Sequence, residues 1–368
     1  MQKLVFNKIN DDTIVVKGVI DGNNFEQFFN LNCEKLVFLD FNEVNDITFS
    51  GLRYLHKTKS YKGKICCFNV SDYLFCKIKD CGFLNHIDLV RKPVNLTSLD
   101  DFEKTGEGFK AVTYNSKDNE TILKIYKNFV SFDAVIKDKY FASKISELGI
   151  ATPMVVNLVN YENSHGIIFE RIHGKKSFSR ALADNFNDMP NIIKRFVKEC
   201  KKLHSTKCDV SSFPSINNFF INVVNNSKIL NSEEKIKIIN SINKIEDTKC
   251  CLHGDIHYGN IIFTEDNNSF FIDLSDFASG NYMYDIGILC MNTFLIPEEI
   301  TYDLYHINKD QMIKCWDAFV REYFETDNQE RIEKITNEAM FFAALKILVY
   351  ASRKYYPWMR PIVEKYLL

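Results

Sequence analysis

One stretch of the chain, residues 250–287, constrains it more than any other: CCLHGDIHYGNIIFTEDNNSFFIDLSDFASGNYMYDIG. Two short apolar runs within it, Ile-Ile-Phe and Phe-Phe-Ile, predict the strands of a hairpin. Asp255 and Asn260 come just before the first run, and Asp273 directly follows the second. Because a hairpin brings its open end together, we expect these three polar side chains to face one point.

These three side chains are the groups that phosphoryl transfer requires. Catalysis of that reaction consists mostly of positioning and of neutralising charge on the transferred group. Asp255 fits the base that accepts the proton of the attacking hydroxyl, and Asn260 and Asp273 fit oxygen ligands of Mg²⁺. Each acid alone is equally typical of a turn or a helix cap. The spacing H-x-D-x-x-x-x-N, however, is that of the protein-kinase catalytic loop.

The run HGDIHYGN at residues 253–260 resembles the catalytic loop of the aminoglycoside phosphotransferase and choline kinase family. The segment DLSD, which begins at Asp273, resembles the metal-binding segment of that family, and YDIG contains the Asp, here Asp285, that braces the loop. The resemblance implies a catalytic loop that includes His253. It also implies a bilobal protein-kinase-like fold that uses ATP, or GTP, with Mg²⁺.

The same resemblance extends to a small lobe over residues 100–172. Gly106 and Gly108 are typical of a glycine-rich hairpin over nucleotide phosphates, where glycine permits close backbone approach, although an ordinary hairpin turn has the same pattern. Lys124 lies within an apolar strand, where a lysine needs a reason to be. The family places its phosphate-contacting lysine there, with Lys127 as the alternative in this chain.

An acid on the helix expected at residues 129–148 should pair with this lysine. The family glutamate is not evident, and Asp138 is our choice among the acids available. After two further strands, Glu170 and Ile172 stand at the expected hinge between the lobes. The resemblance implies that their main-chain groups meet the nucleotide base.

A helical large lobe is expected over residues 173–368. His204 matches a Leu-His pair of the family, and we interpret it as a structural side chain rather than a catalyst. The apolar run at residues 339–351 is interrupted by Lys346. The run is too short to span a bilayer, and it predicts a buried helix.

Residues 1–92 have a different pattern, in which strands alternate with helices. This alternation predicts a mostly parallel sheet that is covered by helices. The segments LVFLDFNEV, TFSGL, FNVS and CGF resemble a STAS domain, the fold of anti-sigma-factor antagonists. The overall prediction is therefore an α+β multidomain chain: a STAS-like α/β domain, a linker at residues 93–99, and a bilobal kinase-like fold with a β-rich small lobe and a helical large lobe.

Ser50 matches the serine that is phosphorylated in such antagonists. The family usually has Asp-Ser-Ser-Gly at this position, whereas this chain has Thr-Phe-Ser-Gly. A helix N-cap is the commoner use of a serine at a helix start. The two roles are compatible, because a helix N-terminus stabilises a phosphate.

Composition excludes some partners. A net charge of -2 gives no general attraction to nucleic acid or to an anionic membrane. The chain opens without a secretory leader, so we expect a cytoplasmic protein whose eleven cysteines are mainly reduced core thiols. A zinc site at Cys76 and Cys81 is the alternative for two of them.

Two functions follow from these patterns. The first is a phosphotransferase that moves the γ-phosphoryl of a nucleoside triphosphate to a hydroxyl of a small molecule. The alternative is a regulatory Ser/Thr kinase or a nucleotide-gated switch, in which the STAS-like domain binds a protein partner or is phosphorylated at Ser50. The acceptor is not specified by the sequence, since aminoglycosides, choline, thiamine, sugars and protein hydroxyls all fit the resemblance.

Overall fold

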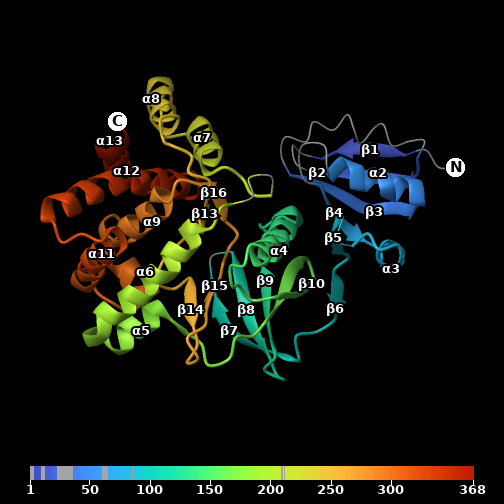
Figure 1. Cartoon of the computed structure of the whole chain (residues 1–368), viewed down its shortest axis with the longest axis horizontal. Coiled ribbons are helices and arrows are strands. Elements are labelled where there is room, and N and C mark those ends of the chain that lie inside the picture. Colours follow the sequence, from blue (N-terminus) through green and yellow to red (C-terminus); the bar gives the residue numbers. More distant parts are fainter. Residues whose placement is uncertain are drawn as a thin grey trace. The chain divides into compact units, whose positions relative to one another are not determined.

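A computed structural model describes residues 4–9, 13–22, 36–59, 65–84, 86–108, 110–208, 210 and 212–368. Its contacts divide the chain into two compact units. Unit 1 comprises Met1–Ser146 and Pro153–Arg171, and unit 2 comprises Glu147–Thr152 and Ile172–Leu368. The first is rich in strands and the second is mostly helical (Figure 1). The short helix predicted at residues 24–31 falls outside the described residues.

Unit 1 begins with a five-stranded sheet in the order β1-β2-β3-β4-β5. Only β1 runs antiparallel to its neighbour, and the other three pairings are parallel. The predicted alternation of strands and helices, and the mostly parallel sheet, are therefore confirmed. The elements are β1 (Val5–Lys8), β2 (Thr13–Ile20), β3 (Val37–Ile47), α2 (Phe49–Lys59), β4 (Ile65–Val70), α3 (Asp72–Asp80) and β5 (Asp88–Arg91).

The expected cap of α2 was wrong by two residues. Thr48, rather than Ser50, caps this helix, since its Oγ1 accepts a hydrogen bond from the backbone N–H of Gly51 at 3.1 Å. The hydroxyl of Ser50 instead lies 2.9 Å from Thr48 Oγ1 and accepts from Gly22 N–H at 3.1 Å. Because the helix starts two residues earlier than expected, Ser50 lies inside its first turn, where its hydroxyl ties the helix to the backbone that follows β2.

A second six-stranded sheet follows in unit 1, in the order β6-β10-β11-β9-β8-β7. All its pairings are antiparallel except that of β6 with β10. The segment expected as a linker, residues 93–99, contributes β6. The elements are β6 (Val94–Leu96), β7 (Phe102–Glu107), β8 (Ala111–Ser116), β9 (Thr121–Tyr126), α4 (Phe132–Glu147), β10 (Val155–Tyr161) and β11 (Ser164–Glu170).

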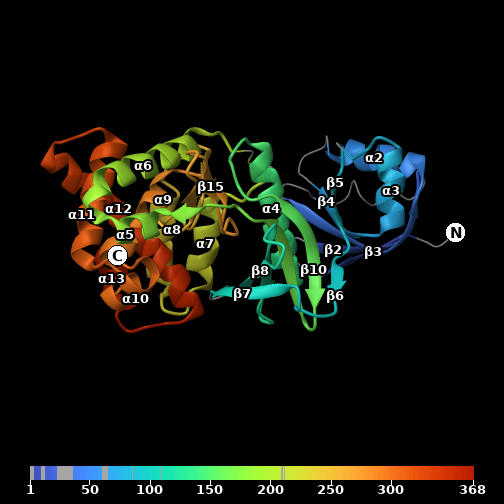
Figure 2. The same ribbon diagram turned by 90° about the horizontal axis from the view of Figure 1, so that it is seen from below.

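Helix α4 packs against the first sheet of unit 1 (Figure 2). Along β3, alternate residues such as Leu39 join the core under α2 and α3, whereas Phe38 points to the opposite face of the sheet. Phe38 is nevertheless only 3% exposed, and its ring contacts that of Tyr140 on α4 at 5.8 Å. Lys144 of α4 pairs with Asp88 at 2.7 Å. The sheet is thus buried on both faces.

Unit 2 is built around helices, with two small sheets of order β12-β14-β15 and β13-β16. Its helices are α5 (Phe178–Asp184), α6 (Met189–Ser205), α7 (Ile216–Asn226), α8 (Ser232–Ile242), α9 (Met283–Phe294), α10 (Glu298–Tyr305), α11 (Lys309–Phe324), α12 (Gln329–Arg353) and α13 (Met359–Leu367). Its strands are β12 (Lys176–Ser177), β13 (Cys250–Leu252), β14 (Ile261–Phe263), β15 (Ser269–Phe271) and β16 (Ala278–Gly280).

Helix α12 is longer than the apolar run that predicted it. Its length and composition would allow it to cross a membrane, but 61% of its most apolar window is buried inside the protein. This is the behaviour of a core helix, as predicted. Helix α12 packs closely on α9. Gly287 of α9 makes this possible, since a Cβ there would collide with the side chain of Phe342 of α12.

The ten cysteines within the described ranges are free thiols, and seven of them are buried. This agrees with the expectation of reduced core cysteines. Cys76 is exposed and Cys81 is half-buried. Among the residues that the structure describes, no group of three or more His, Cys, Asp and Glu side chains could hold a metal ion, so the zinc alternative gains no support.

Candidate active site

The predicted hairpin of unit 2 forms as expected. Strands β14 and β15 pair antiparallel, with Ile261 opposite Phe271. Strands β13 and β16 pair in the same way on either side of it in the sequence. The loop that carries Asp255 and Asn260 therefore starts from one strand pair and ends in the other.

A buried carboxylate, Asp285 at the start of α9, holds this loop from behind. It is fully buried and accepts hydrogen bonds from the backbone N–H groups of His253 at 2.8 Å and Gly254 at 2.9 Å. His204 Nε2 lies 3.1 Å from the same carboxylate, and its Nδ1 lies 2.8 Å from the hydroxyl of Tyr323. Burial raises the pKa of Asp285, but the bonds and charges from His204 and His253 outweigh it and hold the pKa below its usual value.

Glycine is required at position 254 for this arrangement. Its φ of 77° lies in the left-handed region, and a Cβ there would collide with the carbonyl oxygen of Asp276. His253 is fully buried, and its Nε2 lies 3.0 Å from the carbonyl oxygen of Ile272. Its ring thus links the loop to the end of β15, so His253 holds the backbone on both sides of the site.

Asn260 and Asp255 meet directly. Asn260 Nδ2 donates to the backbone carbonyl of Asp255 at 2.9 Å. This hydrogen bond fixes the amide nitrogen toward Asp255, so the amide oxygen points the other way. The side chain of Asp255 remains 31% exposed, whereas Asn260 is only 7% exposed. A carboxylate that is open to solvent thus stands beside a fixed, nearly buried amide.

Asp273 lies two residues after the end of β15, and the residue between them ties this segment to Asn260 through the backbone. The N–H of Ile272 donates to the carbonyl of Asn260 at 3.0 Å. Asp273 adopts a left-handed φ of 57°, which aspartate tolerates better than most residues. The two side chains offer an amide oxygen and a carboxylate, and these hard oxygen donors are the kind that Mg²⁺ prefers.

The sequence reasoning missed two charged residues behind Asp255. Lys346 of α12 lies 3.4 Å from Asp255 Oδ1, donates to the carbonyl of Gly254 at 2.7 Å and to Asp276 Oδ2 at 3.2 Å. Burial lowers the pKa of Lys346, but the two carboxylates overcome this and raise it. The available signal was the lysine inside an apolar run, the same reasoning that singled out Lys124.

His257 lies in the loop between Asp255 and Asn260 and is uncharged. Burial lowers its pKa to about 4, although the nearby carboxylates of Asp255 and Asp273 oppose this. Its Nδ1 accepts from the N–H of Gly259 at 3.0 Å, so it acts there as a neutral ring. His257 therefore supplies no positive charge to the site at neutral pH.

In unit 1, Lys124 sits at the centre of the six-stranded sheet, opposite Thr113 of β8 and Ile167 of β11. Its ammonium lies 5.1 Å from the ring centroid of Tyr126, which is two residues along the same strand face. The hydroxyl of Tyr126 donates to Asp138 of α4 at 2.6 Å. Tyr126 therefore connects the strand that carries Lys124 to the acid that we expected as its partner.

The glycines expected over the phosphates lie at a hairpin end. Gly106 is in β7, at a shift in the pairing register with β8, and a Cβ there would approach the hydroxyl of Thr113 to 2.9 Å. Gly108 donates to the carbonyl of Ala111 at 2.8 Å and closes the turn. The predicted hairpin is present, with room for no side chain at Gly106.

The expected hinge residues fall at the boundary between the units. Glu170 ends β11 in unit 1, and its side chain accepts from the N–H of Met154 at 2.9 Å. Ile172 begins the longer part of unit 2.

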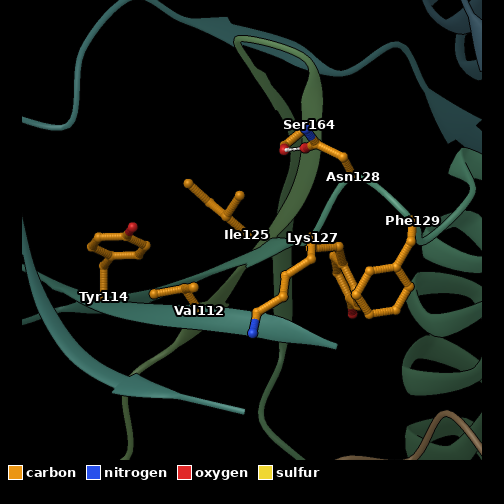
Figure 3. Close-up of a pocket in the computed structure, with 8 residues that line it drawn as sticks. Val112, Tyr114, Ile125, Lys127, Asn128, Phe129 and Ser164 are labelled. Atoms are coloured by element: carbon orange, nitrogen blue, oxygen red, sulfur yellow. Dashed lines mark hydrogen bonds between the residues drawn. The ribbon is translucent and has the colours of Figure 1, made fainter. Parts of the chain in front are cut away.

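A hollow of about 560 Å³ in unit 1 lies against strands β8 and β9. Val112, Tyr114 and Ile125 line it (Figure 3), and these three residues belong to the sheet face opposite that of Lys124. Tyr126, which shares a strand face with Lys124, lines it too, whereas Lys124 itself is not one of its lining residues. Lys127 also lines it and pairs with Glu107 at 3.0 Å, which fits a solvated strand end better than a phosphate contact.

Comparison with known proteins gives one family match. Residues 240–319 match the phosphotransferase enzyme family, and this segment includes the whole of the stretch from Cys250 to Gly287. A search of curated proteins finds no match to the sequence.

Similar folds occur among solved structures. The apo form of a thermostable mutant of aminoglycoside phosphotransferase APH(4)-Ia has a TM-score of 0.51 at 12% identity, over 73% of this chain and 94% of that one. A ternary complex of a variant of that enzyme with AMP-PNP and hygromycin B has a TM-score of 0.52 at 11% identity, with the same coverage of both chains. These likenesses show the fold, and the family match over residues 240–319 supports a phosphotransferase.

Proposed function

We propose that the protein transfers the γ-phosphoryl group of ATP to a hydroxyl of a small molecule, with Asp255 as the base. The observation that carries this proposal is the solvent-open carboxylate of Asp255, which stands on a loop whose backbone is held by buried Asp285. A base must be reachable and fixed in orientation, and this loop meets both needs.

The proposed reaction needs a single protein base to accept the proton of the acceptor hydroxyl. The acceptor oxygen attacks the γ-phosphorus, the bond between that phosphorus and the β–γ bridging oxygen breaks, and ADP leaves. The hydroxyl proton passes to Asp255. Because the transition state is loose, the base mainly orients the hydroxyl, and a strongly basic group is not needed.

Asn260 and Asp273 would hold Mg²⁺, which supplies positive charge to the phosphate oxygens when bound. The contact of Asn260 Nδ2 with the Asp255 carbonyl leaves the amide oxygen as the ligand. The exposed position of Asp273 after β15 gives its carboxylate access to a cation from solvent.

Lys124 would bind the α- and β-phosphates, under the hairpin of Gly106 and Gly108. Main-chain groups of Glu170 and Ile172 would contact the adenine base of the nucleotide. Asp138 would hold Lys124 in place through Tyr126. ATP is our expected nucleotide because solved structures with this fold contain ADP or AMP-PNP.

The acceptor is a hydroxyl-bearing small molecule. One similar enzyme has been solved with hygromycin B, so aminoglycosides are the first probes, followed by choline and sugars.

The test of this function uses two measurements on the full chain. The first is a titration of AMP-PNP binding with Mg²⁺, and the second is ADP release from ATP with each probe and with water alone. Asp273→Ala should abolish the effect of Mg²⁺ on binding, and Asp255→Ala should abolish turnover while binding persists. Binding that survives both changes, with no turnover by the parent, would refute the proposal.

We propose as a second function that residues 1–92 form a STAS-like domain that regulates the kinase-like part. The specific support is that α4, which carries Asp138, covers the second face of the N-terminal sheet through Phe38, Asp88 and Thr13. In protein kinases the position of the corresponding helix controls activity.

The test of this second function starts from γ-labelled ATP and the full chain. Label on the protein that disappears in Ser50→Ala would support regulation by phosphorylation. Absence of label, together with a nucleotide affinity unchanged in Lys144→Met, would contradict a regulatory role for this domain.

A further inference from the structure

Lys346 is a lysine buried in the middle of the core helix α12. Only 3% of the residue is exposed, and the run around it is otherwise apolar. A charged group in such a place is retained only when it is paired and hydrogen-bonded. We propose that Lys346 is a positioning residue for Asp255, which it fixes by placing a buried positive charge behind the carboxylate. This inference rests on the proposed function.

The ammonium group of Lys346 makes two hydrogen bonds and one further ion pair. Its Nζ donates to the Gly254 carbonyl at 2.7 Å and to Asp276 Oδ2 at 3.2 Å. The ion pair is with Asp255 Oδ1, which lies 3.4 Å from Nζ. Two of these three partner atoms belong to adjacent residues of the catalytic loop, so the lysine holds both the backbone and the side chain of that turn.

The exposure of Lys346, Asp276 and Asp255 shows on which side of the carboxylates the positive charge lies. The side chain of Lys346 is 4% exposed, whereas that of Asp276 is 25% exposed and that of Asp255 is 31% exposed. The charge therefore lies on the protein side of the carboxylates, and the carboxylates lie on the open side. A hydroxyl approaching Asp255 from solvent would find its carboxylate already held from the opposite side.

The histidines near this loop do not replace the charge of Lys346. His257, in the loop itself, is neutral because burial lowers its pKa to about 4. His204 and His253 contact Asp285 on the other side of the loop backbone. The carboxylates of Asp255 and Asp276 would repel each other without a cation close to both. The ammonium of Lys346 is that cation.

The experiment compares four variants of the full chain. Lys346→Met keeps the length of the side chain and removes its charge, and Lys346→Arg keeps the charge. Lys334→Met is the matched control, because Lys334 lies on the same helix and is exposed. Asp276→Asn leaves Lys346 and Asp255 in place and tests the pair if Lys346→Met does not fold. The readouts are kcat and KM for Mg·ATP, and the melting temperature.

We expect Lys346→Met to lower kcat about 100-fold with little change in KM for Mg·ATP, because a displaced catalytic group costs rate rather than nucleotide binding. Lys346→Arg should recover part of kcat, Asp276→Asn should lower kcat less, and Lys334→Met should match the parent. A folded Lys346→Met variant with the kcat of the parent would overturn the inference. The inference would also be overturned if both Lys346 variants had a lower melting temperature than the parent but the same kcat as each other.

A second measurement separates this inference from the proposed function. The ¹³C-carboxyl signal of Asp255, assigned by its loss in Asp255→Asn, can be followed by NMR without nucleotide. It should be displaced or broadened in Lys346→Met and unchanged in Lys334→Met. If the parent shows no turnover, the proposed function fails, and this signal still decides whether Lys346 holds Asp255. An Asp255 signal that is identical in Lys346→Met overturns the inference.

Discussion

Two buried lysines, one in each unit, pair with carboxylates and yet serve different ends. Lys144 of α4 contacts Asp88 at 2.7 Å, and both side chains are 11% exposed. Lys346 of α12 is 4% exposed, but its partners Asp255 and Asp276 are 31% and 25% exposed. The first pair is closed from solvent on both sides, and the second is closed only on the lysine side.

The difference teaches how to tell a structural pair from a functional one. A pair closed on both sides can join two elements, as Lys144 joins α4 to the N-terminal sheet, but it offers nothing to a substrate. A pair with an open carboxylate keeps that carboxylate available while its charge and position are held from behind. Removing the lysine should therefore harm stability in the first case and turnover in the second.

The largest expected effect on stability is that of Lys144→Met. This change removes the ammonium partner of Asp88, which keeps the Tyr140 hydroxyl at 3.4 Å, and breaking a mostly buried pair from one side costs about 3 kcal/mol. Lys346→Met should cost about 1–2 kcal/mol, because water reaches both remaining carboxylates. Urea denaturation of the two variants measures the difference. The comparison breaks if Lys346→Met is the more destabilised of the two.

Replacing both members of the closed pair should restore most of that loss. Asp88→Leu combined with Lys144→Met removes both charges of the pair and leaves apolar groups, which is often nearly neutral for buried ion pairs. The double variant should therefore unfold within about 1 kcal/mol of the parent in urea. If it is as unstable as Lys144→Met alone, the pair contributes through something other than charge, such as the packing of the lysine stem.

Asp276→Asn should have a smaller effect, and on turnover rather than stability. The variant keeps Lys346 against Asp255 but loosens its second anchor, so we expect kcat to fall about 10-fold, less than the loss from a fully displaced group. Steady-state ADP release with Mg·ATP measures it, with Lys334→Met as the control. A fall larger than that in Lys346→Met would mean that Asp276, not Lys346, is the group that matters.

The smallest expected effect is that of Thr13→Val in the N-terminal sheet. Thr13 is 1% exposed and donates to Asp133 of α4 at 3.2 Å. Losing this hydrogen bond should cost about 1 kcal/mol, since the valine fills the same space. Thermal unfolding followed by circular dichroism measures it. An unchanged melting temperature would indicate that α4 is held by Lys144 and the aromatic contacts alone.

The sequence predicted what is local and periodic. The hairpin of β14 and β15 follows from two apolar runs with polar residues between them, and the parallel N-terminal sheet follows from alternating strands and helices. The cap of α3 is a local feature of the same kind, since the hydroxyl of Ser71 accepts from the N–H of Leu74, three residues further on. Each of these depends on residues close in sequence.

What the sequence did not predict depends on distant contacts or on a shift of two residues. Lys346 meets Gly254 across 92 positions, and no local pattern states which loop a buried lysine will reach. Burial of the second face of the N-terminal sheet by α4 is equally non-local. The helix cap at Thr48 instead of Ser50 shows the other limit, since two hydroxyl residues this close in sequence offer nearly equal caps.

The most direct test of the central claim is a single-turnover assay with γ-³²P-ATP, Mg²⁺ and the acceptor probes, using the parent chain and Asp255→Asn. The account predicts that label leaves ATP with the parent enzyme and enters a small molecule or inorganic phosphate. With Asp255→Asn the rate should fall about 10²- to 10⁴-fold while AMP-PNP still binds. Equal rates in the two proteins would contradict the role of Asp255, and the absence of both turnover and nucleotide binding in the parent would contradict the phosphotransferase itself.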